Sequence, residues 1–209
     1  MQLSSFENNV TQPKVHQVDD LIRLFEQTFY ADFNTKVVKG DDEPIYIPAN
    51  EQCPYHQIIF AHGFYASALH EIAHWCLAGP KRRLLEDFGY WYLPDGRNAE
   101  QQAKFEQAEI KPQAIEWALS VACGKAFDVS VDNLNGEAEP DRFAFKAKVW
   151  QQVQVYLSQG FPPQAQQLIQ ALAEYYQVPL PLTLASFQYG GQIKSQANFT
   201  AQVEPPAYA

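Results

Sequence analysis

The sequence predicts an α+β fold, in which a small N-terminal β-sheet packs on several α-helices. Short strand-like segments cluster within residues 35–63, whereas apolar residues at helical spacing dominate most of the remaining chain. With 209 residues, of which 46% are hydrophobic, the chain is long enough for one domain with a substantial core. We expect a single domain over residues 1–177. Residues 178–209, rich in Pro, Gln, Ser and Gly, are expected to form an extended, partly disordered tail.

The first expected elements are a helix and three strands. Residues 18–29 place their apolar side chains on one stripe, which is typical of an amphipathic helix. Residues 35–48 favour two short strands around a Gly-Asp-Asp turn, and residues 56–63 favour a third, buried strand that ends at a glycine. The small sheet should therefore lie directly before the next helix.

That next helix is expected to run from Tyr65 or Ala66 to Leu77. It should end there because Gly79 suits a C-terminal cap and Pro80 blocks continuation. The later helices are expected where apolar residues recur at helical spacing or where a proline can open the first turn. These segments are residues 81–88, 112–127, 141–158 and 163–177.

Charge and composition limit the classes of partner. The net charge of -9 argues against general nucleic-acid binding, since such binding requires a broad basic face. No segment approaches the roughly 18 consecutive apolar residues of a membrane span, and the first residues lack the basic-then-apolar order of an export signal. The three cysteines form no CxxC pair, so we expect reduced thiols. These features predict a cytoplasmic protein that binds no membrane.

The stretch LHEIAHW, residues 69–75, contains the pattern of a helical metal site. His70 and His74 lie one helical turn apart, so both rings can bind one metal ion, while Glu71 is rotated by about 100° around the helix. A chance pair of histidines on a helix is the alternative. The glutamate in the required position favours the metal site.

Two histidines leave a divalent site incomplete, and a carboxylate from a following helix commonly completes it. Glu116 is the preferred third ligand, because it follows Pro112 by about one turn among apolar residues, where an unpaired carboxylate is costly to bury. A surface glutamate stabilised by the helix dipole is the alternative. Glu109 ranks second, because it precedes Pro112 and so is expected outside the regular helix. The further candidates are Glu86, Asp87 and Glu106.

Other residues could line a substrate pocket beside the metal, and Glu109 is one of them if its carboxylate is not a ligand. His62 lies at the end of the buried strand. It could be a hydrogen-bonded structural histidine, or it could contact the substrate or a metal ligand. Tyr90 and Tyr92 belong to an aromatic run that is usually core but can also line a pocket for an aliphatic or cationic side chain. Asp95 and Arg97 flank a Pro-Asp-Gly turn and either stabilise it or bind substrate.

The donor set alone leaves the chemistry open. Two histidines and a carboxylate hold zinc in peptidases, where Glu71 would act as the general base on metal-bound water. The same donors hold ferrous iron in oxygenases. Taken by itself, HExxH on a helix favours the zinc metallopeptidase.

The sequence that follows the motif favours the oxygenase over the peptidase. Residues 70–117 resemble the bacterial elongation factor P hydroxylase family, through the pieces HEIAHW, RRLLEDFGYWY, PDGRN and KPQAIEW. Weaker similarity extends from about residue 56 to residue 176. The resemblance implies an enzyme that hydroxylates the lysine of elongation factor P after a β-lysyl group has been attached to it. It also implies that His70 and His74 bind the metal, with Glu116 as our choice for the carboxylate ligand.

This activity bears on the metal and on Glu71. Hydroxylation of an unactivated carbon requires an oxidant that zinc cannot supply, so iron(II) is the expected working metal, although zinc or another metal could occupy the purified protein. Glu71 then loses its role as hydrolytic base and could relay protons, bind ammonium groups or orient a ligand. The metal site should lie between the motif helix and the Glu116 helix, in an arrangement similar to the minimal zincin fold.

Overall fold

The computed structural model describes residues 14–41, 43–87, 96–131, 133, 135–136 and 140–189. Helices and a small sheet both form, so the predicted α+β class is confirmed. In chain order the elements are α1 (Val18–Phe33), β1 (Thr35–Lys39), β2 (Ile45–Ile47), β3 (His56–Phe60), the 3-10 turn η1 (Ala61–Gly63), α2 (Tyr65–Leu77), the 3-10 turn η2 (Arg82–Leu84), α3 (Ala99–Ala122), α4 (Arg142–Gln159), α5 (Pro163–Tyr176) and the 3-10 turn η3 (Leu184–Ser186).

The sheet has β3 at its centre, with β1 parallel on one side and β2 antiparallel on the other. Ile58 of β3 pairs with Val37 of β1 and with Tyr46 of β2. Helix α1 packs against β1, and α2 packs against β3. The sheet thus forms directly before α2, as the sequence predicts, and supports one side of that helix.

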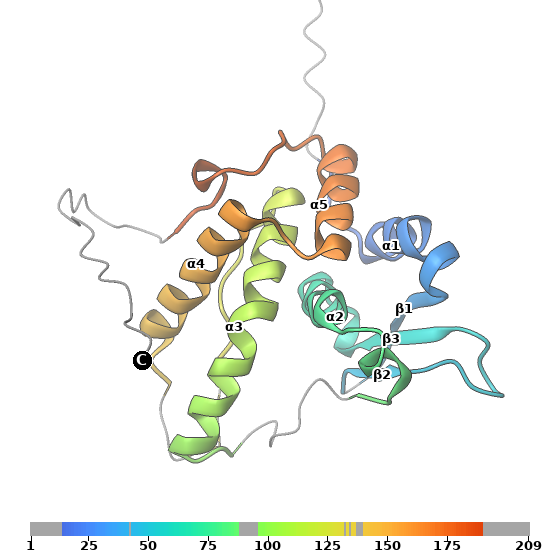
Figure 1. Cartoon of the computed structure of the whole chain (residues 1–209), viewed down its shortest axis with the longest axis horizontal. Coiled ribbons are helices and arrows are strands. Elements are labelled where there is room, and N and C mark those ends of the chain that lie inside the picture. The colour runs from blue at the N-terminus through green and yellow to red at the C-terminus, as the bar shows by residue number, and fades with distance from the viewer. Residues whose placement is uncertain are drawn as a thin grey trace, which may run out of the picture.

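Helix α2 lies between the sheet and α3 (Figure 1). Trp75 anchors it to α1, because its ring centroid lies 5.0 Å from those of Phe25 and Phe29. The helix ends at Leu77, as expected, but the residue that follows it is Ala78 in an extended conformation rather than a glycine cap. The motif helix is therefore packed on two sides, which fixes the position of its side chains relative to α3.

Helix α3 begins earlier than predicted. Expecting it to start at Pro112 was wrong, because the helix runs from Ala99 to Ala122. Asn98 and Gln101 form a capping box, in which each side chain accepts a hydrogen bond from the backbone N–H of the other at 3.0 Å. Pro112 lies inside the helix, so burial of this helix outweighs the backbone hydrogen bond that proline cannot donate.

The later helices α4 and α5 both form near their expected positions, and each packs against α3. The helix expected over residues 81–88 is shorter: only the turn η2 forms, and Asp87 pairs with Tyr46 beside β2 instead. None of the helices in the described part of the chain combines the length and apolar character needed to cross a membrane.

The chain remains packed on the core after α5. Phe187 is buried, and its ring centroid lies 5.9 Å from that of Trp117 in α3. Tyr189 stacks on the same tryptophan at 6.2 Å. The domain boundary at residue 177 stays a prediction, and residues 190–209 lie outside the described part of the chain.

Candidate metal centre

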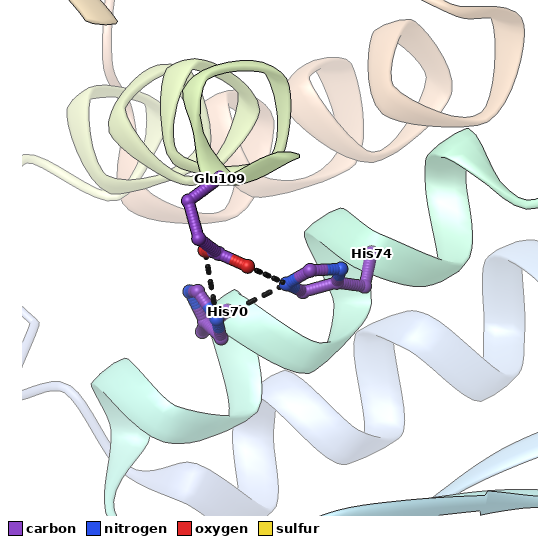
Figure 2. Close-up of side chains that lie close together, drawn as sticks. All are labelled: His70, His74 and Glu109. Carbon is purple, nitrogen blue, oxygen red and sulfur yellow. Dashed lines mark hydrogen bonds and ion pairs between the residues drawn. The ribbon is translucent and has the colours of Figure 1, made fainter. Parts of the chain in front are cut away.

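Two histidines of α2 and one glutamate of α3 converge in a triangle (Figure 2). The Nε2 atoms of His70 and His74 lie 3.2 Å apart. Glu109 places Oε1 at 3.2 Å from His74 Nε2 and Oε2 at 3.5 Å from His70 Nε2. Residues from two helices that are far apart in sequence thus direct four donor atoms at one point.

This triangle fits a divalent metal ion. Nitrogen and oxygen ligands lie about 2.1 Å from such an ion, so neighbouring ligands at tetrahedral or octahedral angles lie about 3.0–3.4 Å from each other. The three distances are close to that range. Glu109 is 0% exposed, and its buried Oε1 lies 3.2 Å from His74 Nε2 without a hydrogen bond of good geometry. A buried carboxylate oxygen without a hydrogen bond is costly, and a cation between the three side chains would compensate it.

Glu116 lies on the opposite edge of the His70 ring. Its Oε2 is 2.8 Å from His70 Nδ1, whereas the triangle uses Nε2 of that ring. A histidine that binds metal through one nitrogen commonly donates the other N–H to a carboxylate, which fixes the tautomer and the ring orientation. Glu109 and Glu116 are seven residues, or about two turns, apart on α3, so both point to α2 from the same face.

Gln113 connects Glu109 to the backbone that follows α3. Its Nε2 donates to Glu109 Oε2 at 3.2 Å and to the carbonyl of Ser130 at 2.7 Å. Its Oε1 accepts from the N–H of Ser130 at 3.0 Å. Because Gln113 is itself buried, these bonds hold Oε2 of Glu109 in place and leave Oε1 directed at His74.

Charge is strongly coupled within this cluster. Burial on its own lowers the pKa of His70, but the negative charges of Glu109 and Glu116 outweigh it and raise this pKa to about 10. Burial likewise raises the pKa of Glu109, but His74 and His70 outweigh it and lower this pKa to about 2. Without a metal, a proton on His70 neutralises part of the negative charge, and a metal ion can take the place of that proton.

Glu71 has a different environment from its neighbour His70. It lines a pocket with His74 on the side of α2 that faces the sheet. Burial raises the pKa of its carboxyl group. The other side chains that line the pocket are Ile45, Tyr46, Ile58, Trp75, Ala78, Arg82, Arg83 and Asp87. The catalytic candidate of the HExxH motif therefore faces a recess beside the triangle.

The remaining candidates lie elsewhere. His62 is exposed in η1 with a left-handed φ of 56°, and its ring lies against Phe64. Arg97 is 1% exposed, donates from Nε to Gln102 at 2.8 Å and stacks on Phe105 at 3.8 Å, which favours its structural role. Tyr90, Tyr92 and Asp95 lie outside the described residues.

Sequence reasoning ranked Glu109 second and missed Gln113. The expectation that Glu109 lies outside the regular helix was wrong, because α3 begins ten residues before it. The start signal was present as Asn98 followed by Gln101, three residues later, which is the spacing of a capping box. With the helix started there, Glu109, Gln113 and Glu116 fall on one face at helical spacing.

Comparison with known proteins agrees with these features. The family model for elongation factor P hydroxylase matches residues 24–187, which include the whole triangle and the pocket. A curated relative from Haemophilus influenzae, elongation factor P lysine hydroxylase, is 52% identical over 172 residues, which cover 82% of this chain and 96% of the relative. The chain belongs to the elongation factor P hydroxylase family.

Proposed function

We propose that this protein is a metal-dependent hydroxylase that adds one oxygen atom to a lysine of translation elongation factor P. Its family and the name of its relative from Haemophilus influenzae support this activity and this substrate. The observation that carries the proposal is the convergence of His70, His74 and the buried Glu109 in one triangle. Non-haem iron(II) oxygenases use such a donor set with open positions.

The distances support one assignment of the ligands. We propose that Nε2 of His70, Nε2 of His74 and the carboxylate of Glu109 hold the metal, and that Glu116 orients His70 through Nδ1. The sequence had instead favoured Glu116 as the third ligand and Glu109 as the second choice. Glu109 is favoured because it lies beside both Nε2 atoms, whereas the contact of Glu116 is with the far side of one ring.

Iron(II) is the proposed metal. When bound, iron supplies the redox change that oxygen insertion requires and that zinc lacks. The protein residues contribute the rest: Glu116 keeps the His70 tautomer that presents Nε2, and Gln113 keeps Glu109 in its orientation. The zinc metallopeptidase with Glu71 as base is not favoured, because the relative is named a hydroxylase.

The substrate is proposed in more detail from the resemblance that the motifs carry. It is the lysine of elongation factor P after attachment of a β-lysyl group, and the reaction is proposed to take place in the cytoplasm. This form of the substrate carries positive charge on a long aliphatic arm, which suits a partly buried pocket with a carboxylate and aromatic side chains.

Mass spectrometry of elongation factor P tests the activity. Purified protein loaded with iron(II) and supplied with oxygen and a reductant should add the mass of one oxygen atom to the peptide that contains the modified lysine. The backbone of elongation factor P should remain intact. Cleavage without an added oxygen would instead support the peptidase, and elongation factor P that is bound but unaltered would contradict both activities.

A further inference from the structure

Glu71 is placed to do something other than bind the metal. It follows His70 directly, so its side chain leaves α2 about 100° away from the direction of the two histidines. The pocket that it lines also includes His74, so the pocket and the triangle share a wall. A molecule in this pocket would therefore lie next to the metal cluster.

Arg82, Arg83 and Asp87 also line the pocket and make contacts of their own, while Nε of Arg83 is buried without a hydrogen bond within the described residues. Arg82 and Asp87 form an ion pair with each other. The guanidinium of Arg83 lies 4.1 Å from the ring of Trp75, and its Nη2 donates to the carbonyl of that residue at 3.0 Å. These contacts hold both arginines at the η2 end of the pocket.

Glu71 differs from these three side chains. Within the part of the chain that the structure describes, no hydrogen bond or ion pair reaches its carboxylate, although only part of the side chain is exposed. An unpaired carboxylate that is partly removed from water costs free energy, and a cation that binds beside it recovers that cost. The pocket therefore provides a site for one positive charge at the end that borders His74.

We propose that Glu71 binds the ammonium group of the substrate lysine arm and so positions the arm in this pocket. The inference rests on the proposed function, because it takes the substrate to be a lysine. Ile45, Ile58 and Trp75 provide apolar surface for the methylene groups of the arm. When Glu71 binds the ammonium group, the lysine arm lies next to the metal triangle. Glu71 then determines specificity for a positively charged substrate.

The test compares a charged and a neutral substrate in binding. The probes are elongation factor P with its native modified lysine and elongation factor P whose amino groups on that lysine arm have been acetylated. The wild-type protein should bind the charged form about 10- to 100-fold more tightly, which is the range for a hydrogen bond to a charged group. Equal binding of both forms by the wild-type protein would overturn the inference without reference to any variant.

The matched variant is Glu71→Gln, which keeps the shape and removes the charge. It should lose the preference for the charged form, and its KM should rise by a similar factor while metal content stays at the wild-type value. Glu86→Gln is the control, because Glu86 is a nearby exposed carboxylate outside the pocket lining. Glu86→Gln should retain the preference.

Three outcomes for Glu71→Gln contradict the inference: an unchanged preference for the charged form, a fall in kcat with unchanged KM, or a loss of metal. The last would place Glu71 among the ligands. The proposed function is judged separately, by whether the wild-type protein adds oxygen. Charge-selective binding without hydroxylation would refute the proposed hydroxylase activity but support the role of Glu71 in the pocket. Hydroxylation with an unchanged KM for Glu71→Gln would support the activity but refute that role.

Discussion

The two sides of α2 differ in how their charges are satisfied. On the side that faces α3, His70, His74, Glu109 and Glu116 contact one another, and each carboxylate lies within 3.5 Å of an imidazole nitrogen. On the side that faces the sheet, Glu71 lies in a pocket with no described partner. This difference underlies our two proposals: one side of α2 binds a metal ion, and the other binds a positive charge that arrives with the substrate.

The largest expected effect is loss of the metal when a ligand of the triangle is removed. His70→Ala, His74→Ala and Glu109→Gln should each weaken metal binding by more than about 100-fold, because removal of a ligand exceeds the 10- to 100-fold effect of an outer partner. The metal content of dialysed protein measures this effect. Circular dichroism of the metal-free variants checks that the helices persist, and full metal retention in any of them would remove that residue from the ligand set.

A smaller effect is expected at Glu116, which contacts only Nδ1 of His70. Glu116→Gln should weaken metal binding by about 10- to 100-fold, since it retains an oxygen near the ring but loses the charge. Titration with iron(II) under anaerobic conditions gives the dissociation constant. If Glu116→Gln loses more affinity than Glu109→Gln, Glu116 becomes the third ligand, as sequence reasoning first favoured.

Gln113 is expected to have a smaller effect, because it donates a hydrogen bond to Glu109 but contacts neither histidine in the described contacts. Gln113→Met fills the same space but cannot donate to Glu109 or accept from Ser130. We expect metal binding to weaken by about 10-fold and the metal-free protein to lose about 1–3 kcal/mol of stability. Chemical denaturation of the metal-free protein separates the two effects. Unchanged metal affinity with reduced stability would leave Gln113 a purely structural role.

The pH dependence of metal binding tests the coupling inside the triangle. The pKa of His70 is raised to about 10 in the metal-free protein, so this ring carries a proton at neutral pH and must release it to bind metal. Metal affinity should therefore increase as pH rises from 7 to 9, by up to about tenfold per pH unit for one proton. Calorimetry in buffers of different ionisation enthalpy counts the proton released. No release of protons would show that His70 is neutral before metal binds.

Local patterns predicted the motif helix and the histidine pair, because the 3.6-residue period and the HExxH spacing depend on neighbouring residues alone. The strands before α2 were predicted for the same reason. The third carboxylate was harder, because which face of α3 meets α2 depends on packing between segments far apart in sequence. Pro112 also misdirected the start of α3, since proline favours a first turn but is tolerated inside a helix when packing compensates.

The pocket beside Glu71 was even harder to predict from the sequence than the third carboxylate. Its lining comes from β2, β3, α2 and the segment around η2, so no local pattern in the sequence groups these residues. Glu71 was recognised as a candidate through its position in the motif, but its separation from the triangle became visible only with the fold. The resemblance over residues 70–117 supplied the chemistry that donor identity left open.

Anomalous X-ray diffraction from crystals of the iron(II)-loaded protein would show which side chains bind the metal. We predict one strong iron peak about 2.0–2.3 Å from Nε2 of His70, Nε2 of His74 and a carboxylate oxygen of Glu109, with Glu116 still bonded to Nδ1 of His70. A peak coordinated by Glu71 or Glu116 in place of Glu109 would contradict this prediction, as would the absence of iron from the triangle.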